Sequence, residues 1–160
     1  MKITRSHAVA TLGTLTATLA ALALGPATVA HAAPAAPAAS PYDRCEGTTP
    51  PSWFYPKAEA AADADSSIPN SWGDSIDFAR IVCAESSYET SADNDDTYFG
   101  LGQLSKDAIS NANISFSDYE NGNSDHGTRY FQLLAALRYM KSRYSSPSDA
   151  WAHEVNDSWW

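Results

Sequence analysis

The chain has 160 residues, of which 10 are Lys or Arg and 19 are Asp or Glu, and its formal net charge is −9. An acidic surface repels polyphosphates, so nucleic acid and anionic membranes are disfavoured as partners. The same charge also serves simply to keep a protein soluble. The length is that of one domain with a single core.

Residues 1–32 have the pattern of a signal peptide. Lys2 and Arg5 precede an apolar run, and Ala30-His31-Ala32 supplies the small-x-small pattern of a cleavage site. The run is broken by threonine, glycine and proline, unlike a spanning helix of about 20 apolar residues. We therefore expect a secreted protein, extracellular or associated with the cell wall, with no membrane contact in its mature form. Cleavage leaves eight basic residues against 19 acidic ones, a net charge of −11.

Residues 33–50 form an Ala/Pro-rich spacer and an N-terminal segment. The stretch APAAPAASP, residues 33–41, has no amphipathic period and is typical of an extended linker. We expect the folded part to begin near Tyr42 and its main helical domain to occupy residues 51–160. The residues KAEAAADAD after Pro56 are typical of a short solvated helix.

Apolar periodicity in the remaining sequence predicts helices. The first runs over 74–86 with Asp74 as its N-cap, and a short one follows Ser105. A long helix is predicted over 126–144, where apolar residues recur at steps of three and four, and a last one starts at Ser146-Pro147. Only ISFSDY, residues 114–119, alternates like a strand, and one run cannot make a sheet. The predicted fold class is all-α or nearly so.

Cys45 and Cys83 are the only cysteines. An even count in an exported chain favours a disulfide, and the alternative is two independent thiols with Cys83 buried. A bridge across this loop would stabilise the fold by roughly 3 to 4 kcal/mol in the chain-entropy model. Cys83 and Glu85 are two residues apart, about 200° around a helix, so the bond would hold the back of the helix that presents Glu85.

Glu85 lies at the end of the first strong helix. Phe78, Ile81 and Val82 share its side of that helix, so its surroundings are partly dry. Desolvation disfavours a carboxylate and raises its pKa above about 4.3, as a general acid near neutral pH requires. The alternative is a surface glutamate at a helix end.

The segment ESSYETSADNDDTYFGLGQL, residues 85–104, resembles the signature of the lytic transglycosylase (SLT domain) and goose-type lysozyme superfamily. In that signature, Glu-Ser-x-aromatic is followed by a Gly-Leu-x-Gln loop. The matching positions are Glu85, Ser86, Tyr88, Ala92, Gly100, Leu101 and Gln103.

Residues 133–160 are similar to the ending of small secreted bacterial members of that superfamily. They depart from the better-known soluble enzymes, which have Ala-Tyr-Asn-x-Gly where this chain has Ala150-Trp151-Ala152-His153-Glu154. Substrate contacts of that asparagine therefore cannot be carried over. The resemblance covers about residues 70–160.

The resemblance implies a lysozyme-like helical domain, built around a central catalytic helix, that acts on peptidoglycan glycan strands as a monomer without a cofactor. Glu85 is then the single acid/base, and Ser86 polarises or orients groups near it. Gln103 and the backbone of Gly100, Leu101 and Gly102 line the sugar-binding cleft. Tyr139 points toward Glu85. For Tyr88, Tyr139 and Trp151, core packing is an equal alternative to sugar contact.

A second carboxylate separates two mechanisms, because ordinary glycosidases use two. Asp93, Asp95 and Asp96 are the candidates, although such a run is also typical of a solvated turn. Without them, the N-acetyl group and 6-hydroxyl of N-acetylmuramic acid would act, and a 1,6-anhydro product is expected from the MurNAc-GlcNAc β-1,4 bond. The alternatives are a hydrolytic muramidase and a non-catalytic wall-binding or signalling protein.

Other enzyme classes are disfavoured by what the motifs lack. His126 and His153 stand alone without the spacing of metal ligands, so no metal site is predicted. A Ser-His-Asp hydrolase is disfavoured because the chain has no Gly-x-Ser-x-Gly turn.

Overall fold

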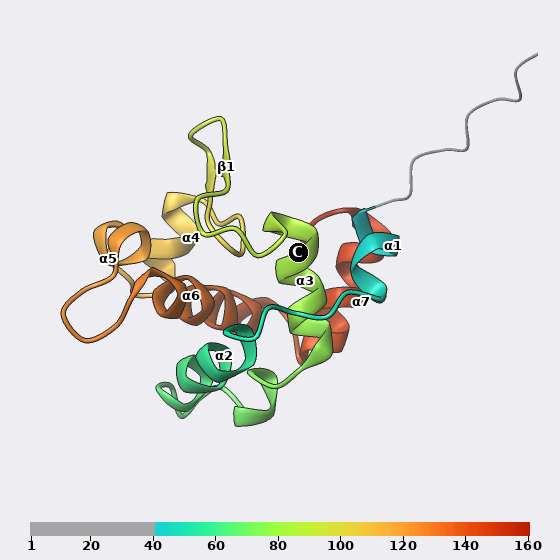
Figure 1. The fold of residues 1–160 in the computed structure, drawn as a ribbon, viewed down its shortest axis with the longest axis horizontal. Coiled ribbons are helices and arrows are strands. Elements are labelled where there is room, and N and C mark those ends of the chain that lie inside the picture. The colour runs from blue at the N-terminus through green and yellow to red at the C-terminus, as the bar shows by residue number, and fades with distance from the viewer. Residues whose placement is uncertain (1–40) are drawn as a thin grey trace, which may run out of the picture. The chain divides into compact units, whose positions relative to one another are not determined.

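The computed structural model describes residues 41–160, so the expected signal peptide (1–32) and residues 33–40 of the spacer lie outside the described residues. Seven α-helices, one 3-10 helix and one short hairpin make up this part of the chain (Figure 1). In chain order they are α1 (Pro41–Glu46), α2 (Phe54–Asp63), η1 (Asn70–Trp72), α3 (Ile76–Ser86), β1 (Asp93–Asn94), β2 (Tyr98–Phe99), α4 (Lys106–Asn111), α5 (Phe116–Asn121), α6 (Thr128–Arg143) and α7 (Pro147–Asp157). The prediction of a mostly helical chain is confirmed.

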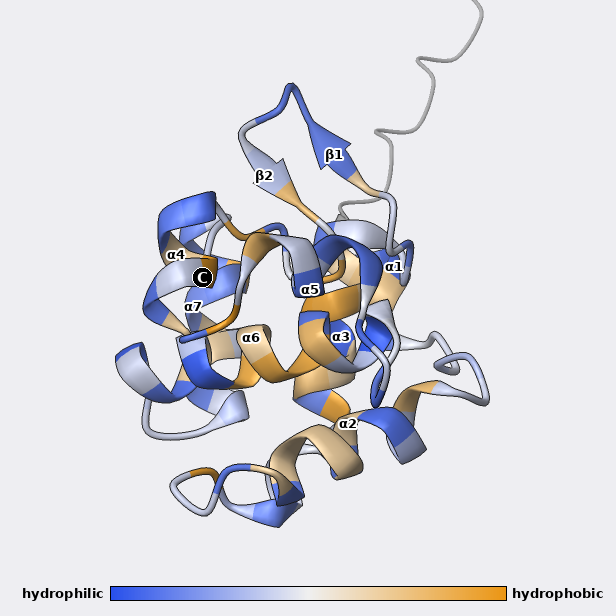
Figure 2. Cartoon of the chain, turned by 90° about the vertical axis from the view of Figure 1, so that its left-hand side faces the viewer, coloured by the Kyte–Doolittle hydropathy of each residue, from blue (hydrophilic) through white to orange (hydrophobic). Residues whose placement is uncertain are grey.

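Helices α3 and α6 form the centre of the fold. Helices α1 and α7 pack on α3, while α2, α4 and α5 pack on α6. The apolar residues of these two central helices turn inward, as their colouring in Figure 2 shows. The steps of three and four along α6 are those predicted, with Tyr130, Leu133, Leu137 and Met140 all buried.

Serine side chains begin four of the helices. Ser75, Ser105, Ser115 and Ser146 each accept a hydrogen bond from a backbone N–H in the first turn that follows. The prediction of Asp74 as the cap of α3 is wrong by one residue, because Ser75 accepts from Phe78. The cap predicted at Ser105 is confirmed, and α7 begins at Ser146-Pro147 as predicted, with Ser146 as its cap.

At two places the packing of the fold overrides the local sequence pattern. The strand-like run at 114–119 belongs largely to α5, which buries Tyr119 and begins at the Ser115 cap. Helix α2 begins at Phe54, before the predicted start, and it is not solvated all round. Its buried face, Phe54 and three alanines, lies against α6. Pro56 is tolerated there because first-turn N–H groups have no partner within the helix.

The hairpin β1–β2 is the only sheet among the described residues. Asn94 pairs with Tyr98, and Asp93 with Phe99. The Thr97 N–H donates to the Asn94 carbonyl at 3.1 Å, while Asp95 and Asp96 have φ of +53° and +58°. Such a turn favours Asn, Asp and Gly at its centre. The hairpin turn therefore explains the run of acidic residues. This is the second of the two interpretations given above, a solvated turn and not a catalytic carboxylate.

The disulfide Cys45–Cys83 is present, with the two Cα atoms 5.8 Å apart, and this prediction is confirmed. It ties α1 to the back of α3. Within the described residues, none of the helices has both the length and the apolar character needed to cross a membrane.

Candidate active site

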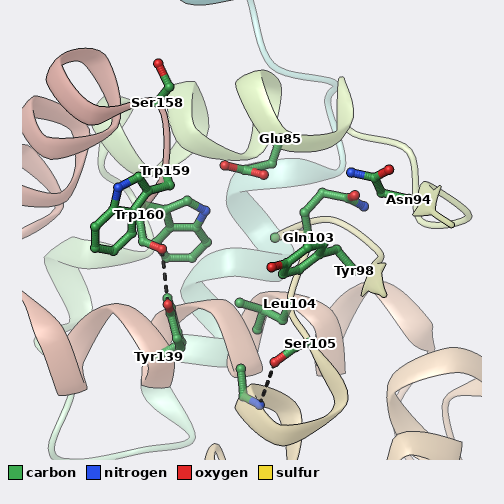
Figure 3. Close-up of a pocket in the computed structure, with 12 residues that line it drawn as sticks. Glu85, Asn94, Tyr98, Gln103, Leu104, Ser105, Tyr139, Ser158, Trp159 and Trp160 are labelled. Atoms are coloured by element: carbon green, nitrogen blue, oxygen red, sulfur yellow. Dashed lines mark hydrogen bonds between the residues drawn. The ribbon is translucent and has the colours of Figure 1, made fainter. Parts of the chain in front are cut away.

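A cleft of about 390 Å³ opens beside the last turn of α3 (Figure 3). Its walls come from α3, the hairpin, the loop leading into α4, α6 and the segment after α7. The lining residues are Glu85, Asn94, Tyr98, Gly102, Gln103, Leu104, Ser105, Ala108, Tyr139, Ser158, Trp159 and Trp160. Segments far apart in the sequence therefore meet around one carboxyl group.

The Glu85 carboxyl is partly buried at this cleft. Phe78, Ile81 and Val82, which share its side of the helix, are fully buried as expected. Burial raises the pKa of Glu85 to about 8, and the negative charge of Glu154 adds to the rise, while a hydrogen bond from the Trp160 side chain opposes it. At neutral pH, Glu85 is therefore a protonated acid that can give up a proton, as general acid catalysis requires.

Glu154 is a second buried carboxylate, but it is not among the residues that line the cleft. It belongs to α7, which packs on α3, and its side chain is 4% exposed. Burial raises the pKa of Glu154, whereas a hydrogen bond from Tyr42 on α1 and the charge of His153 lower it. Its Oε2 atom is buried without a hydrogen-bond partner. Glu154 thus acts on Glu85 through its charge and does not itself line the cleft.

Three of the predicted site residues hold the Gly-Leu-x-Gln loop in place behind the cleft. The Ser86 hydroxyl lies 3.0 Å from the carbonyls of both Val82 and Leu101, which joins α3 to this loop. Leu101 is fully buried. Gly100 has φ of +66°, and a Cβ there would lie 2.6 Å from the Gln132 amide. Ser86, Gly100 and Leu101 are therefore structural supports in this geometry.

Gln103 and Tyr139 do line the cleft together with Glu85. The Gln103 Nε2 donates to the carbonyls of Ala92 and Gly100, at 3.1 and 3.0 Å. This orientation leaves the Oε1 atom as the acceptor that the amide can offer to a ligand. The Tyr139 hydroxyl donates to the main-chain oxygen of Trp160 at 3.1 Å, so it fixes the segment that carries the tryptophan.

None of Asp93, Asp95 and Asp96 lines the cleft. Side chains alternate along a strand, and cross-strand partners share a face. Asn94 and its partner Tyr98 accordingly face the cleft, whereas Asp93 borders a separate pocket. Asp95 and Asp96 form the exposed turn. Glu85 carries the one side-chain carboxylate among the lining residues of the described chain.

Tyr88 and Trp151, the other two aromatic residues considered for sugar contact, pack in or against the core. Tyr88 donates from its hydroxyl to the Ala79 carbonyl at 2.9 Å, and burial raises its pKa to about 12. Trp151 is buried, with Tyr42 edge-on at 6.0 Å between ring centres. Neither lines the cleft.

Left-handed backbone is concentrated in the segment between Glu85 and Leu104, of which Gln103 lines the cleft. Of the nine described residues with positive φ, six lie between Glu85 and Leu104, namely Ser87, Tyr88, Asp95, Asp96, Gly100 and Gln103. Outside glycine, this conformation costs on the order of 1 kcal/mol or more each, so the surrounding structure must hold it in place. Such clustering is typical of functional sites.

Sequence reasoning missed Gln132, Glu154 and Trp160. Gln132 is 2% exposed; it accepts from the Leu101 N–H at 3.0 Å and donates to the carbonyls of Thr90 and Tyr119. The sequence does contain a signal for Gln132, because it is a polar residue among the apolar residues of a long helix. Glu154 and Trp160 carry no local signal, because only tertiary packing brings them to Glu85.

Within the described part of the chain, no three His, Cys, Asp or Glu side chains come together as metal ligands would. What the cleft offers a ligand is one acid, amide and hydroxyl groups, and aromatic rings. No family model, no curated protein and no solved structure matches the chain. Its function is therefore inferred from the residues of the cleft.

Proposed function

We propose that the protein is a secreted enzyme that cleaves the MurNAc-GlcNAc β-1,4 bond of peptidoglycan, with Glu85 as its single acid/base. The proposal is carried by one observation: among the described residues, the only side-chain carboxyl group that lines the cleft is that of Glu85, and burial raises its pKa to about 8. The resemblance of residues 85–104 to lytic transglycosylases supports the same choice of residue.

In the proposed reaction, the protonated Glu85 donates its proton to the glycosidic oxygen as the bond to the anomeric carbon breaks. The resulting carboxylate then accepts the proton of the substrate's own 6-hydroxyl. That oxygen bonds to the anomeric carbon, which gives a 1,6-anhydro sugar and returns Glu85 to its protonated form. No water is consumed, and the N-acetyl group assists at the anomeric carbon.

The lack of a second lining carboxylate favours this course over hydrolysis, since a hydrolase needs a group to activate water or attack carbon. Asp93, Asp95 and Asp96 do not line the cleft, and neither does the buried Glu154. Each Asp→Asn change should therefore alter the rate by about tenfold or less, through local electrostatics alone.

The test is digestion of purified peptidoglycan, with mass spectrometry of the released muropeptides. Anhydro species, lighter by one water than reducing ends, are expected from the wild type. Glu85→Gln should fold but lose activity by about 10² to 10⁴-fold, because an amide cannot donate and recover a proton. Reducing ends alone would identify a hydrolytic muramidase, and no release at all would favour a non-catalytic wall-binding protein.

A further inference from the structure

Two half-exposed aromatic rings line the cleft. Tyr98 is 44% exposed and Trp159 is 49% exposed, and they lie on opposite sides of Glu85 in Figure 3. The other large apolar side chains that are exposed in the described chain, Ile76 and Val155, do not line this cleft. Exposed apolar surface gathered in a groove marks a place where a ligand binds.

The fold holds Tyr98 toward the cleft. Its neighbour on β2, Phe99, points the other way and packs on Phe116 with ring centres 5.0 Å apart. This anchor and the cross-strand pair with Asn94 fix the register of the strand, so Tyr98 and Asn94 stay on the cleft face.

Trp159 is fixed from behind. Ser158, with φ of +60°, ends α7 and turns the chain back toward the cleft. The His153 Nδ1 lies 2.8 Å from the Trp159 carbonyl and must carry the proton, because a carbonyl only accepts. The His153 ring packs edge-on at 4.3 Å, and the Arg143 guanidinium lies 5.2 Å from the Trp159 ring centre. The ring is therefore a preorganised platform.

Polar groups lie between the two rings. Glu85 and Gln103 stand there in Figure 3, with the Gln103 Oε1 as an acceptor. A sugar presents both kinds of surface, with hydroxyl groups around its edge and apolar C–H groups on its face. A cleft in which polar groups lie between two aromatic rings therefore fits consecutive sugars of one glycan chain.

We infer that Tyr98 and Trp159 each bind the face of one sugar, on opposite sides of the bond that Glu85 protonates. The cleft then holds a β-1,4-linked glycan by sugars in both directions and cuts within chains. This inference rests on the proposed function, because it places the two rings relative to the bond that is cleaved.

The test is calorimetric binding of N-acetylglucosamine oligomers of two to six units to the Glu85→Gln protein, which keeps the substrate whole. Affinity should rise with length until both rings are covered. Trp159→Ala and Tyr98→Ala should each weaken hexamer binding about tenfold, and the double variant about a hundredfold, because separate sites add. Val155→Ala, a control 43% exposed on α7, should bind as the parent does.

The two ideas fail separately. Suppose that the wild type cleaves peptidoglycan. If the hexamer does not bind to the Glu85→Gln protein, or if either ring variant binds it as tightly as its parent does, then two-sided binding is wrong and the proposed enzymatic activity is retained. If both rings contribute to binding but the wild type cleaves nothing, the enzymatic proposal is wrong and the two-sided glycan site stands.

Discussion

Two residues from the end of the chain act on the Glu85 carboxyl in opposite directions. The buried charge of Glu154 raises the pKa of Glu85, and the Trp160 hydrogen bond lowers it, since the indole N–H donates to the charged form. Burial is the main cause of the raised pKa of Glu85, and two residues that no motif near position 85 contains then adjust it in opposite directions.

A pH profile measures both effects. If protonated Glu85 is required, activity should fall as pH rises through about 8. Glu154→Gln removes the raising charge and should move this fall to lower pH, whereas Trp160→Phe removes the hydrogen bond and should move it to higher pH. Each shift is expected to be about half a pH unit to one unit.

The measurement is kcat/KM against pH for the wild type and the two variants. Val155→Ala is the control, since this side chain is exposed on α7, does not line the cleft and does not act on Glu85. Shifts of equal sign, or a change in rate with no change in the profile, would mean that Glu154 and Trp160 only support the fold.

At the scale of elements, the Gly-Leu-x-Gln loop depends on one side chain of α6. Gln132→Leu keeps a similar size but leaves the Leu101 N–H and the carbonyls of Thr90 and Tyr119 without their partner. Each unpaired buried group costs about 1 to 3 kcal/mol, so the three together are expected to lower the free energy of unfolding by roughly 3 kcal/mol or more.

Urea unfolding of Gln132→Leu measures this loss. Asn111→Leu is the matched control, because Asn111 is an exposed amide at the end of α4 and its replacement should change the free energy of unfolding by less than about 0.5 kcal/mol. Equal stability of the two variants would show that the loop does not need its Gln132 anchor.

Elements with a local cause could be predicted from the sequence. The apolar period of α6, the caps at Ser105 and Ser146 and the cysteine pair all specify structure by themselves. The same was true of Glu85, whose dry side follows from helix geometry. The hairpin and the α5 helix were not predicted, since a two-residue strand and a six-residue helix form only when packing holds them.

At the scale of the whole molecule, the buried acid lowers the stability of the protein. The pKa of Glu85 rises from 4.5 to about 8 on folding. Below 4.5, both the folded and unfolded chains hold the proton, and stability is unaffected. Between 4.5 and 8, only the unfolded chain releases it, so stability falls as pH rises, and above 8 the loss is complete.

Glu85→Gln should therefore be as stable as the wild type at pH 4 and more stable at pH 8, by roughly 2 to 4 kcal/mol. Chemical unfolding at both values measures the difference. The exposed Glu89→Gln serves as control and should show no such gain. A gain of the same size at pH 4 would contradict the assignment to ionisation. Such a trade of stability for an active acid is common at catalytic sites.

The arrangement of the tryptophans also means that the intrinsic fluorescence of the protein can report on ligand binding in the cleft. Of the five tryptophans, Trp72, Trp151 and Trp160 are buried, Trp53 is partly buried, and Trp159 alone is half exposed, at the cleft. A ligand that covers Trp159 removes water from its ring and shifts its fluorescence emission toward the blue. Occupancy of the cleft can therefore be followed in solution without a label.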